Sequence, residues 1–324
     1  MVAGRLAGAI CLILTFIAGG CTHQTQREHL LQGATVENVP FFPQTRYQCG
    51  PAALATVLTH SRVPVAPEEL SPHVYLPGRQ GSLQIELKSA ARLHGRLPYE
   101  IEPELEAIVR ELDAGRPVLV LQNLAFAWAP HWHYAVVVGY DEDRKQFLLN
   151  SGPRERHRQG LRAFQRSWRL ADNWGFVVLS PGELAATGSA NRYLKALSNS
   201  RSVLSDSDHQ MAVSAGLSRW PREPDLLFAA GNHALQLGED EAAASFYKRA
   251  IESDPTHVGA LNNYAEVLKR NECFHQAAAV AETALRHAEL SGFHDQVLET
   301  VLEVKNYLSG TAPEQSQLCQ TLDA

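Results

Sequence analysis

The chain has 324 residues, of which 45% are hydrophobic and 20% charged, as in ordinary globular proteins. Its formal net charge is −6 at pH 7, which argues against a nucleic-acid partner bound through phosphate neutralisation. Five cysteines are too few for a fold built on disulfides. The length indicates one to three globular domains.

The N-terminal segment has the pattern of a secretion signal. Arg5 precedes an apolar run over residues 6–18, which is too short to span ~30 Å of hydrocarbon. The run ends in two glycines and Cys21, and small residues before a cysteine resemble a bacterial lipobox. The resemblance implies a signal peptide over residues 1–20, lipidation of Cys21, and a cell-envelope lipoprotein on the periplasmic side of the outer membrane. The alternative is an ordinary cleaved signal in which Cys21 has no role.

Residues 21–36 are polar and predict a tether, and residues 37–189 predict one α+β domain with helices first and an antiparallel sheet after them. Alanine-rich or amphipathic periodicity predicts the helices, and apolar runs between turn signals predict the strands. We expect a solvated basic loop around His157. The predicted helices are Pro51–Leu58, Ser82–His94 and Pro103–Ala114, and the predicted strands are Pro117–Leu121, His133–Tyr140, Gln146–Asn150 and Gly175–Leu179.

Residues 190–311 are helix-rich and contain a repeat, with residues 312–324 as a polar tail. Pro221 and Pro255 are 34 residues apart, the period of tetratricopeptide repeats. With Pro255 at the last consensus position, large and small residues fall where two helices of such a repeat pack closely. The resemblance is to tetratricopeptide repeats, and the alternative is an unrelated helical bundle. The matching positions are Leu227, Ala230, Gly231, Ala234, Ala243, Tyr247 and Ala250, then Leu261, Tyr264, Ala265, Leu268, Ala277, Ala281 and Ala284.

Two features of this all-α region bear on partners. Stacked helix pairs form a concave groove suited to an extended peptide or a helix, so we expect a protein partner there. Cys273 falls at the predicted turn between the two helices of the second repeat, and Cys319 lies in the tail. The sequence leaves open whether these two cysteines pair.

Cys49 is the candidate nucleophile. It begins a predicted helix, and the free N–H groups and positive potential at a helix N-terminus favour a thiolate. Gln44, five residues upstream, offers a side-chain amide that can form an oxyanion hole with the backbone N–H of Cys49. The alternative is a small buried cysteine with a packing role.

A cysteine nucleophile needs a histidine base and a residue that orients the base. His133 begins the predicted strand, and His131 lies two positions earlier on the same face. We favour His133 as the base. Asn150 ends the neighbouring predicted strand and is the expected orienting residue, although a shift of one residue in register would substitute Ser151.

The same histidines could serve other roles. A metal site would use His131 and His133, but no acidic or cysteine partner stands at ligand spacing, so we expect no metal and no cofactor. Trp128 and Trp132 flank His131 and predict either a wall of a substrate cleft or aromatic core packing.

Gln44, the segment Cys49–Leu54 and the segment His133–Asp141 together resemble the papain-like bacteriocin-processing peptidases, which cleave double-glycine leader peptides. The loop Pro77–Leu83 adds to the resemblance, which covers about Val36 to Pro181. It implies a papain-like fold with Cys49 as nucleophile, His133 as base and Gln44 in the oxyanion hole.

The expected function is an extracytoplasmic, lipid-anchored cysteine peptidase. Its substrate would be a peptide or protein, and its repeats would recruit the substrate or a partner. The alternative is a catalytically idle papain-like module that acts as a protein-binding scaffold in the envelope.

Overall fold

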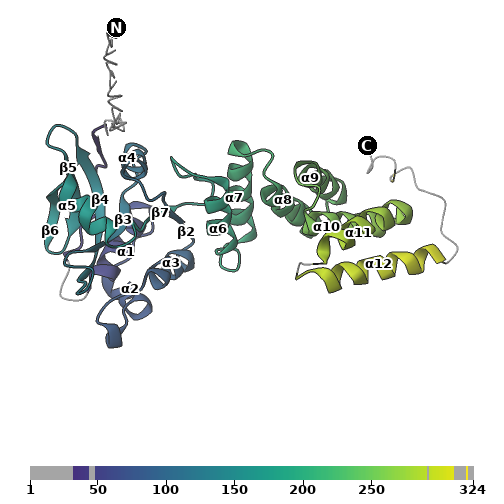
Figure 1. The fold of residues 1–324 in the computed structure, drawn as a ribbon, viewed down its shortest axis with the longest axis horizontal. Coiled ribbons are helices and arrows are strands. Elements are labelled where there is room, and N and C mark those ends of the chain that lie inside the picture. The colour runs from purple at the N-terminus through teal and green to yellow at the C-terminus, as the bar shows by residue number, and fades with distance from the viewer. Residues whose placement is uncertain (1–31, 44–47, 290–291, 310–318, 320–324) are drawn as a thin grey trace, which may run out of the picture. The chain divides into compact units, whose positions relative to one another are not determined.

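The computed structural model describes residues 32–43, 48–289 and 292–309, together with Cys319. An α+β domain comes first and a succession of helices follows it (Figure 1). No helix in these ranges is long and apolar enough to cross a membrane.

One seven-stranded antiparallel sheet organises the first domain, in the order β2-β7-β3-β4-β5-β6, with β1 paired to β4. The predicted strands are all present. The strands are β1 (Ala34–Thr35), β2 (Leu97–Glu100), β3 (Val118–Asn123), β4 (Trp132–Asp141), β5 (Gln146–Ser151), β6 (Arg154–Gly160) and β7 (Gly175–Leu179).

Helices of this domain pack on the sheet, and the three predicted helices are among them. Fully buried Leu54, Leu58 and Leu87 contribute α1 and α3 side chains to the core. The helices are α1 (Cys49–His60), α2 (Pro67–Val74), the short 3-10 helix η1 (Pro77–Arg79), α3 (Gln84–Leu93), α4 (Leu105–Asp113) and α5 (Leu161–Arg169).

Two sequence-based expectations need correction. Ala34 and Thr35, placed in the tether, pair with Tyr140 and Gly139 and so extend the sheet. The basic stretch around His157 is the edge strand β6 rather than a loop, because Leu149 pairs with His157. Because β6 consists almost entirely of polar and charged residues, it lacks the alternation of polar and apolar residues by which a strand is recognised.

The helical region forms the expected repeats. Every matching position is buried except Ala230, which is half-buried. A Cβ at Gly231 would lie 2.5 Å from the Tyr247 ring, so only glycine allows the two helices of that repeat this approach. The helices are α6 (Ala190–Ser198), α7 (Asp206–Arg219), α8 (Pro224–Gln236), α9 (Asp240–Ser253), α10 (Val258–Arg270), α11 (Phe274–Ala288) and α12 (His294–Ser309).

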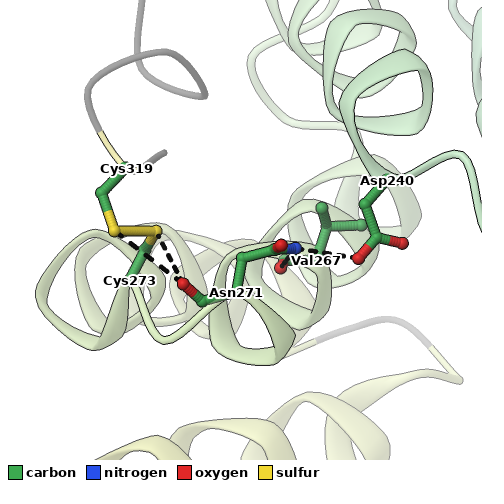
Figure 2. The surroundings of a disulfide bond; sticks show 5 residues. All are labelled: Asp240, Val267, Asn271, Cys273 and Cys319. Atoms are coloured by element: carbon green, nitrogen blue, oxygen red, sulfur yellow. Dashed lines mark hydrogen bonds between the residues drawn. A yellow bond between two sulfur atoms is a disulfide. The ribbon is translucent and has the colours of Figure 1, made fainter. Parts of the chain in front are cut away.

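A disulfide joins Cys273 and Cys319, across a sequence separation of 46 residues (Figure 2). Cys273 caps the start of α11, and both cysteines are fully buried in the core of the repeats. Asn271 supports the turn before α11, since its side chain donates to Asp240 of α9 at 2.9 Å and to the Val267 carbonyl at 2.8 Å. The pairing that the sequence left open is therefore present in the structure.

Candidate active site

Cys49 is the first residue of α1, and it is the free cysteine among the described residues. The residue after it, Gly50, is buried against Ser82, in the loop between η1 and α3. A Cβ on Gly50 would lie 2.2 Å from Ser82 Oγ, so glycine lets this loop close over the start of α1. Ser82 therefore occupies the space beside Gly50.

Burial and backbone hydrogen bonds act in opposite directions on the Cys49 thiol. Burial raises its pKa above the ordinary value, although the backbone N–H groups of Tyr134, Gly50 and Cys49 itself act in the opposite direction. Desolvation thus acts against the thiolate that the helix N-terminus is expected to favour.

His133 lies near the start of β4, and its ring is held by the next strand. His133 Nε2 is 2.8 Å from Ser151 Oγ at the end of β5. If the neutral ring carries its proton on Nε2, it donates to Ser151 and leaves Nδ1 to accept a proton. Hydrogen bonds among the described residues do not include one from this ring to Cys49, whose thiol instead contacts the backbone N–H of the adjacent Tyr134.

A one-residue shift in the pairing of β4 with β5 decides which residue meets His133. The register changes between Val137 and Gly139, as at a β-bulge. Without the shift, Asn150 would pair with Val137 and share the face of His133. With it, Asn150 pairs with Val136, and alternation puts Asn150 on the opposite face.

Asn150 has structural partners of its own. Its Nδ2 donates to the Pro40 carbonyl at 3.3 Å, and its Oδ1 accepts from the Arg156 backbone N–H at 3.1 Å. The side chain is buried, so these bonds satisfy both ends of its amide. The structure thus brings Ser151, and not Asn150, to the candidate base.

The His133 ring is neutral at physiological pH. Burial lowers its pKa to about 4, and the nearby His131 contributes in the same direction. With the thiol pKa raised and the imidazole pKa lowered, the thiol can donate a proton and His133 can accept one.

Cys49 and His133 line the same open cleft, of about 1040 Å³. Ser82, His131, Trp132 and Tyr134 line it too. Trp128 lies outside the cleft and is 83% exposed, so neither of its two predicted roles applies.

Sequence reasoning did not single out Ser82 and Tyr134, which connect the two sides of the cleft. Tyr134 Oη donates to the Ser82 carbonyl at 3.1 Å, and Ser82 Oγ is buried without a hydrogen-bond partner. Ser82 at the start of a predicted helix was the available signal, but it does not specify a contact with Gly50.

Three other predictions from the sequence concern Gln44, Cys21 and the presence of a metal site. Gln44 and Cys21 lie outside the described residues, so their roles stay predictions. Among the described residues, no group of three or more His, Cys, Asp or Glu side chains is arranged to hold a metal ion.

Two family models match the chain. The Peptidase_C39 like family matches residues 36–175, and a tetratricopeptide repeat matches residues 246–279. Residues 36–175 form a C39-peptidase-like domain. This C39-like domain contains the cleft and every described residue of the candidate site, while the repeat match runs from α9 into α11.

Three solved structures are similar to parts of the chain. A C39-like peptidase from Bacillus anthracis is 14% identical, with 46% of this chain and 98% of that chain covered and a TM-score of 0.38. A double glycine motif protease from an AMS/PCAT transporter, solved with the leader peptide, is 22% identical, with 45% and 98% covered and a TM-score of 0.34. The TPR2B domain of yeast Sti1, solved with pHsp70, is 15% identical, with 36% and 96% covered and a TM-score of 0.33. No curated protein matches the sequence.

Proposed function

We propose that the C39-like domain is an active cysteine peptidase that hydrolyses peptide bonds in a protein or peptide substrate. The observation that carries the proposal is that Cys49 and His133 line one cleft while Ser151 holds the second nitrogen of the His133 ring. A nucleophile, a base and a residue that orients the base are the parts that acyl transfer requires.

Because burial raises the pKa of the Cys49 thiol and lowers that of His133, we assign His133 the role of general base during attack. As Cys49 Sγ bonds to the substrate carbonyl carbon, the thiol proton passes to His133 Nδ1 and the carbonyl oxygen becomes an oxyanion. The Cys49 backbone N–H, and Gln44 if it lies as predicted, stabilise that oxyanion. Collapse of this tetrahedral intermediate breaks the carbon–nitrogen bond, and His133 gives its proton to the leaving amine.

The resulting thioester is released by water. His133 accepts a proton from the water as the oxygen attacks, and Cys49 leaves and recovers a proton from His133. Ser151 keeps the ring in one orientation through both halves of the reaction, so we assign it the orienting role that was predicted for Asn150. The bond between Tyr134 and the Ser82 carbonyl joins two residues that line the cleft.

The C-terminal repeats supply a second part of the proposal, namely recruitment of a substrate or a partner protein. Helices α8 to α11 stack as repeats, and stacked repeats present a concave surface to extended peptides or helices. A scaffold without catalysis is the second candidate function, favoured by the raised pKa of the Cys49 thiol.

The peptidase and the scaffold can be distinguished by a comparison of peptides from cell envelopes. One set of envelopes contains the natural protein and the other contains the Cys49→Ser variant. A peptidase leaves cleaved peptides that vanish with Cys49→Ser. An unchanged peptide set, with the variant present at the natural level, contradicts the peptidase proposal and leaves the scaffold.

We further propose that Cys21 carries a lipid that holds the protein at the envelope membrane. Several acyl chains on one cysteine anchor firmly, since each buried methylene contributes ~0.8 kcal/mol. The variant Cys21→Ser should leave the membrane fraction and lose the mass of the lipid. Unchanged fractionation and unchanged mass contradict the anchor.

A further inference from the structure

The loop between β3 and β4, residues 124–131, exposes large apolar side chains at the rim of the cleft; we name it the aromatic loop. Leu124 is 49% exposed, Phe126 54% and Trp128 83%. Phe126 and Trp128 stack, with ring centroids 5.6 Å apart. An exposed cluster of this kind marks an interaction surface, because water solvates it poorly.

Internal hydrogen bonds make the aromatic loop rigid. The buried Asn123 accepts at Oδ1 from the backbone N–H groups of Ala125 and His131, both at 3.0 Å, and donates from Nδ2 to the Phe126 carbonyl at 3.2 Å. The Leu124 N–H also donates to the His131 carbonyl at 2.9 Å. The apolar side chains are therefore held out in solvent by the backbone, and ordering them for binding costs little entropy.

The strand that leads into the aromatic loop contacts the basic helix α5. Gln122, two residues before the loop, donates to Ser167 of α5 at 2.8 Å. On the side of α5 away from buried Phe164, three arginines are exposed, and the ion pairs among the described residues involve none of them. These arginines are Arg162, Arg166 and Arg169.

We propose that the aromatic loop inserts into the interface of an anionic lipid bilayer, with the α5 arginines against the headgroups. Aromatic side chains favour the interface between water and hydrocarbon, and arginines are attracted to anionic headgroups. Leu124, Phe126 and Trp128 are absent from the lining of the cleft, so they offer a projecting tip rather than a wall for a substrate. A tip fits a lipid surface, which needs no complementary pocket.

The consequence concerns where the cleft opens. Pro130, His131 and Trp132 line the cleft and continue directly from the aromatic loop. Insertion of the loop would place the mouth of the cleft at the membrane surface, where a substrate emerging from or lying on the bilayer meets Cys49. The docking itself does not depend on the proposed peptidase function, because it is measured without hydrolysis.

Trp128 fluorescence tests the insertion directly. The full chain carrying Cys21→Ser is mixed with vesicles of phosphatidylglycerol and phosphatidylethanolamine whose acyl chains are brominated or unbrominated. Bromine quenches tryptophans that reach the acyl region, and residues 1–31 contain none of the five tryptophans. We expect quenching with brominated lipid, and loss of most of it in Trp128→Phe, which keeps an aromatic ring. Equal quenching in the two proteins, or none in either, overturns the proposal.

Vesicle sedimentation supplies the matched comparison. Phe126→Ser with Trp128→Ser should weaken partitioning by about tenfold or more, because two large side chains leave the interface. Leu302→Ser, on α12, removes a side chain that is also 54% exposed and should change nothing. If the double variant partitions like the natural sequence but loses labelling of Cys49 by a peptidyl probe without lipid, the loop binds peptide and the membrane proposal is wrong.

Discussion

His133 Nε2 lies 2.8 Å from Ser151 Oγ, and this contact exists because the β4–β5 ladder shifts by one residue between Val137 and Gly139. The serine hydroxyl is a neutral partner, unlike a carboxylate, so it orients the ring without raising its basicity strongly. The pKa of His133, lowered by burial to about 4, is consistent with such a partner.

Ser151→Ala should lower the rate of acylation by roughly tenfold, the effect of one lost hydrogen bond of about 1.4 kcal/mol. The structure predicts little loss of stability, because Ser151 is only half-buried. Single-turnover kinetics with a peptidyl probe measures the rate, and a melting curve the stability.

Asn150→Ala is the matched control for that prediction. Its amide bonds to Pro40 and Arg156, so the substitution should lower the free energy of unfolding by about 1–3 kcal/mol and leave the pH profile of acylation unchanged. If Asn150→Ala lowers the acylation rate and Ser151→Ala leaves it unchanged, the strand register differs from the one described.

The reactivity of the Cys49 thiol should rise with pH. Because burial raises its pKa, the thiolate forms only above the pH at which an ordinary cysteine ionises. Alkylation by iodoacetamide, followed by mass spectrometry of the Cys49 peptide, should show no plateau at acid pH. A reactive plateau between about pH 5 and 7 would reveal a thiolate–imidazolium pair instead.

Gly50→Ala should close off the site by collision with Ser82. The new Cβ would lie 2.2 Å from Ser82 Oγ and 2.6 Å from its Cβ, and such overpacking costs about 1–3 kcal/mol. Labelling of Cys49 should fall with the displaced loop. Adding Ser82→Gly removes both colliding atoms and should restore labelling, whereas failure to restore it would assign Gly50 a role beyond this contact.

Much of this arrangement could be predicted from the sequence, and the exceptions have physical causes. Cys49 and His133 follow from a helix start and a strand start, both of which are local patterns. Ser151 does not, because a bulge inside an apolar run leaves no mark in composition. The raised pKa of the Cys49 thiol could not be predicted from the sequence either, since it results from burial in the folded structure.

The domain boundary expected at residue 189 is another feature that local sequence patterns do not describe fully. The Ser189 N–H donates to Tyr99 Oη at 3.0 Å, and Arg192 of α6 pairs with Glu102 at 2.7 Å. These contacts cross the boundary and tie α6 to the sheet domain. The composition changes at this point in the chain, but the packing continues across it.

The disulfide should stabilise the repeats without touching the cleft. Closing 46 residues restricts the unfolded chain and contributes about 4 kcal/mol in the chain-entropy description. Cys319→Ser, or reduction of the natural protein, should lower the melting temperature while Cys49 labelling keeps its rate. A fall in that rate at a temperature where the protein stays folded would couple the repeats to the site.

Covalent capture by a peptidyl vinyl sulfone, read by intact mass and peptide mapping, tests the roles of Cys49 and His133 most directly. We expect one adduct, on Cys49, with a rate that falls by ~10²–10⁴ in His133→Ala and far less in His131→Ala. Cys49→Ala should give no adduct while it melts like the natural protein. An adduct on another residue at the full rate, or a stronger effect of His131 than of His133, would contradict the assignment of Cys49 and His133 as nucleophile and base.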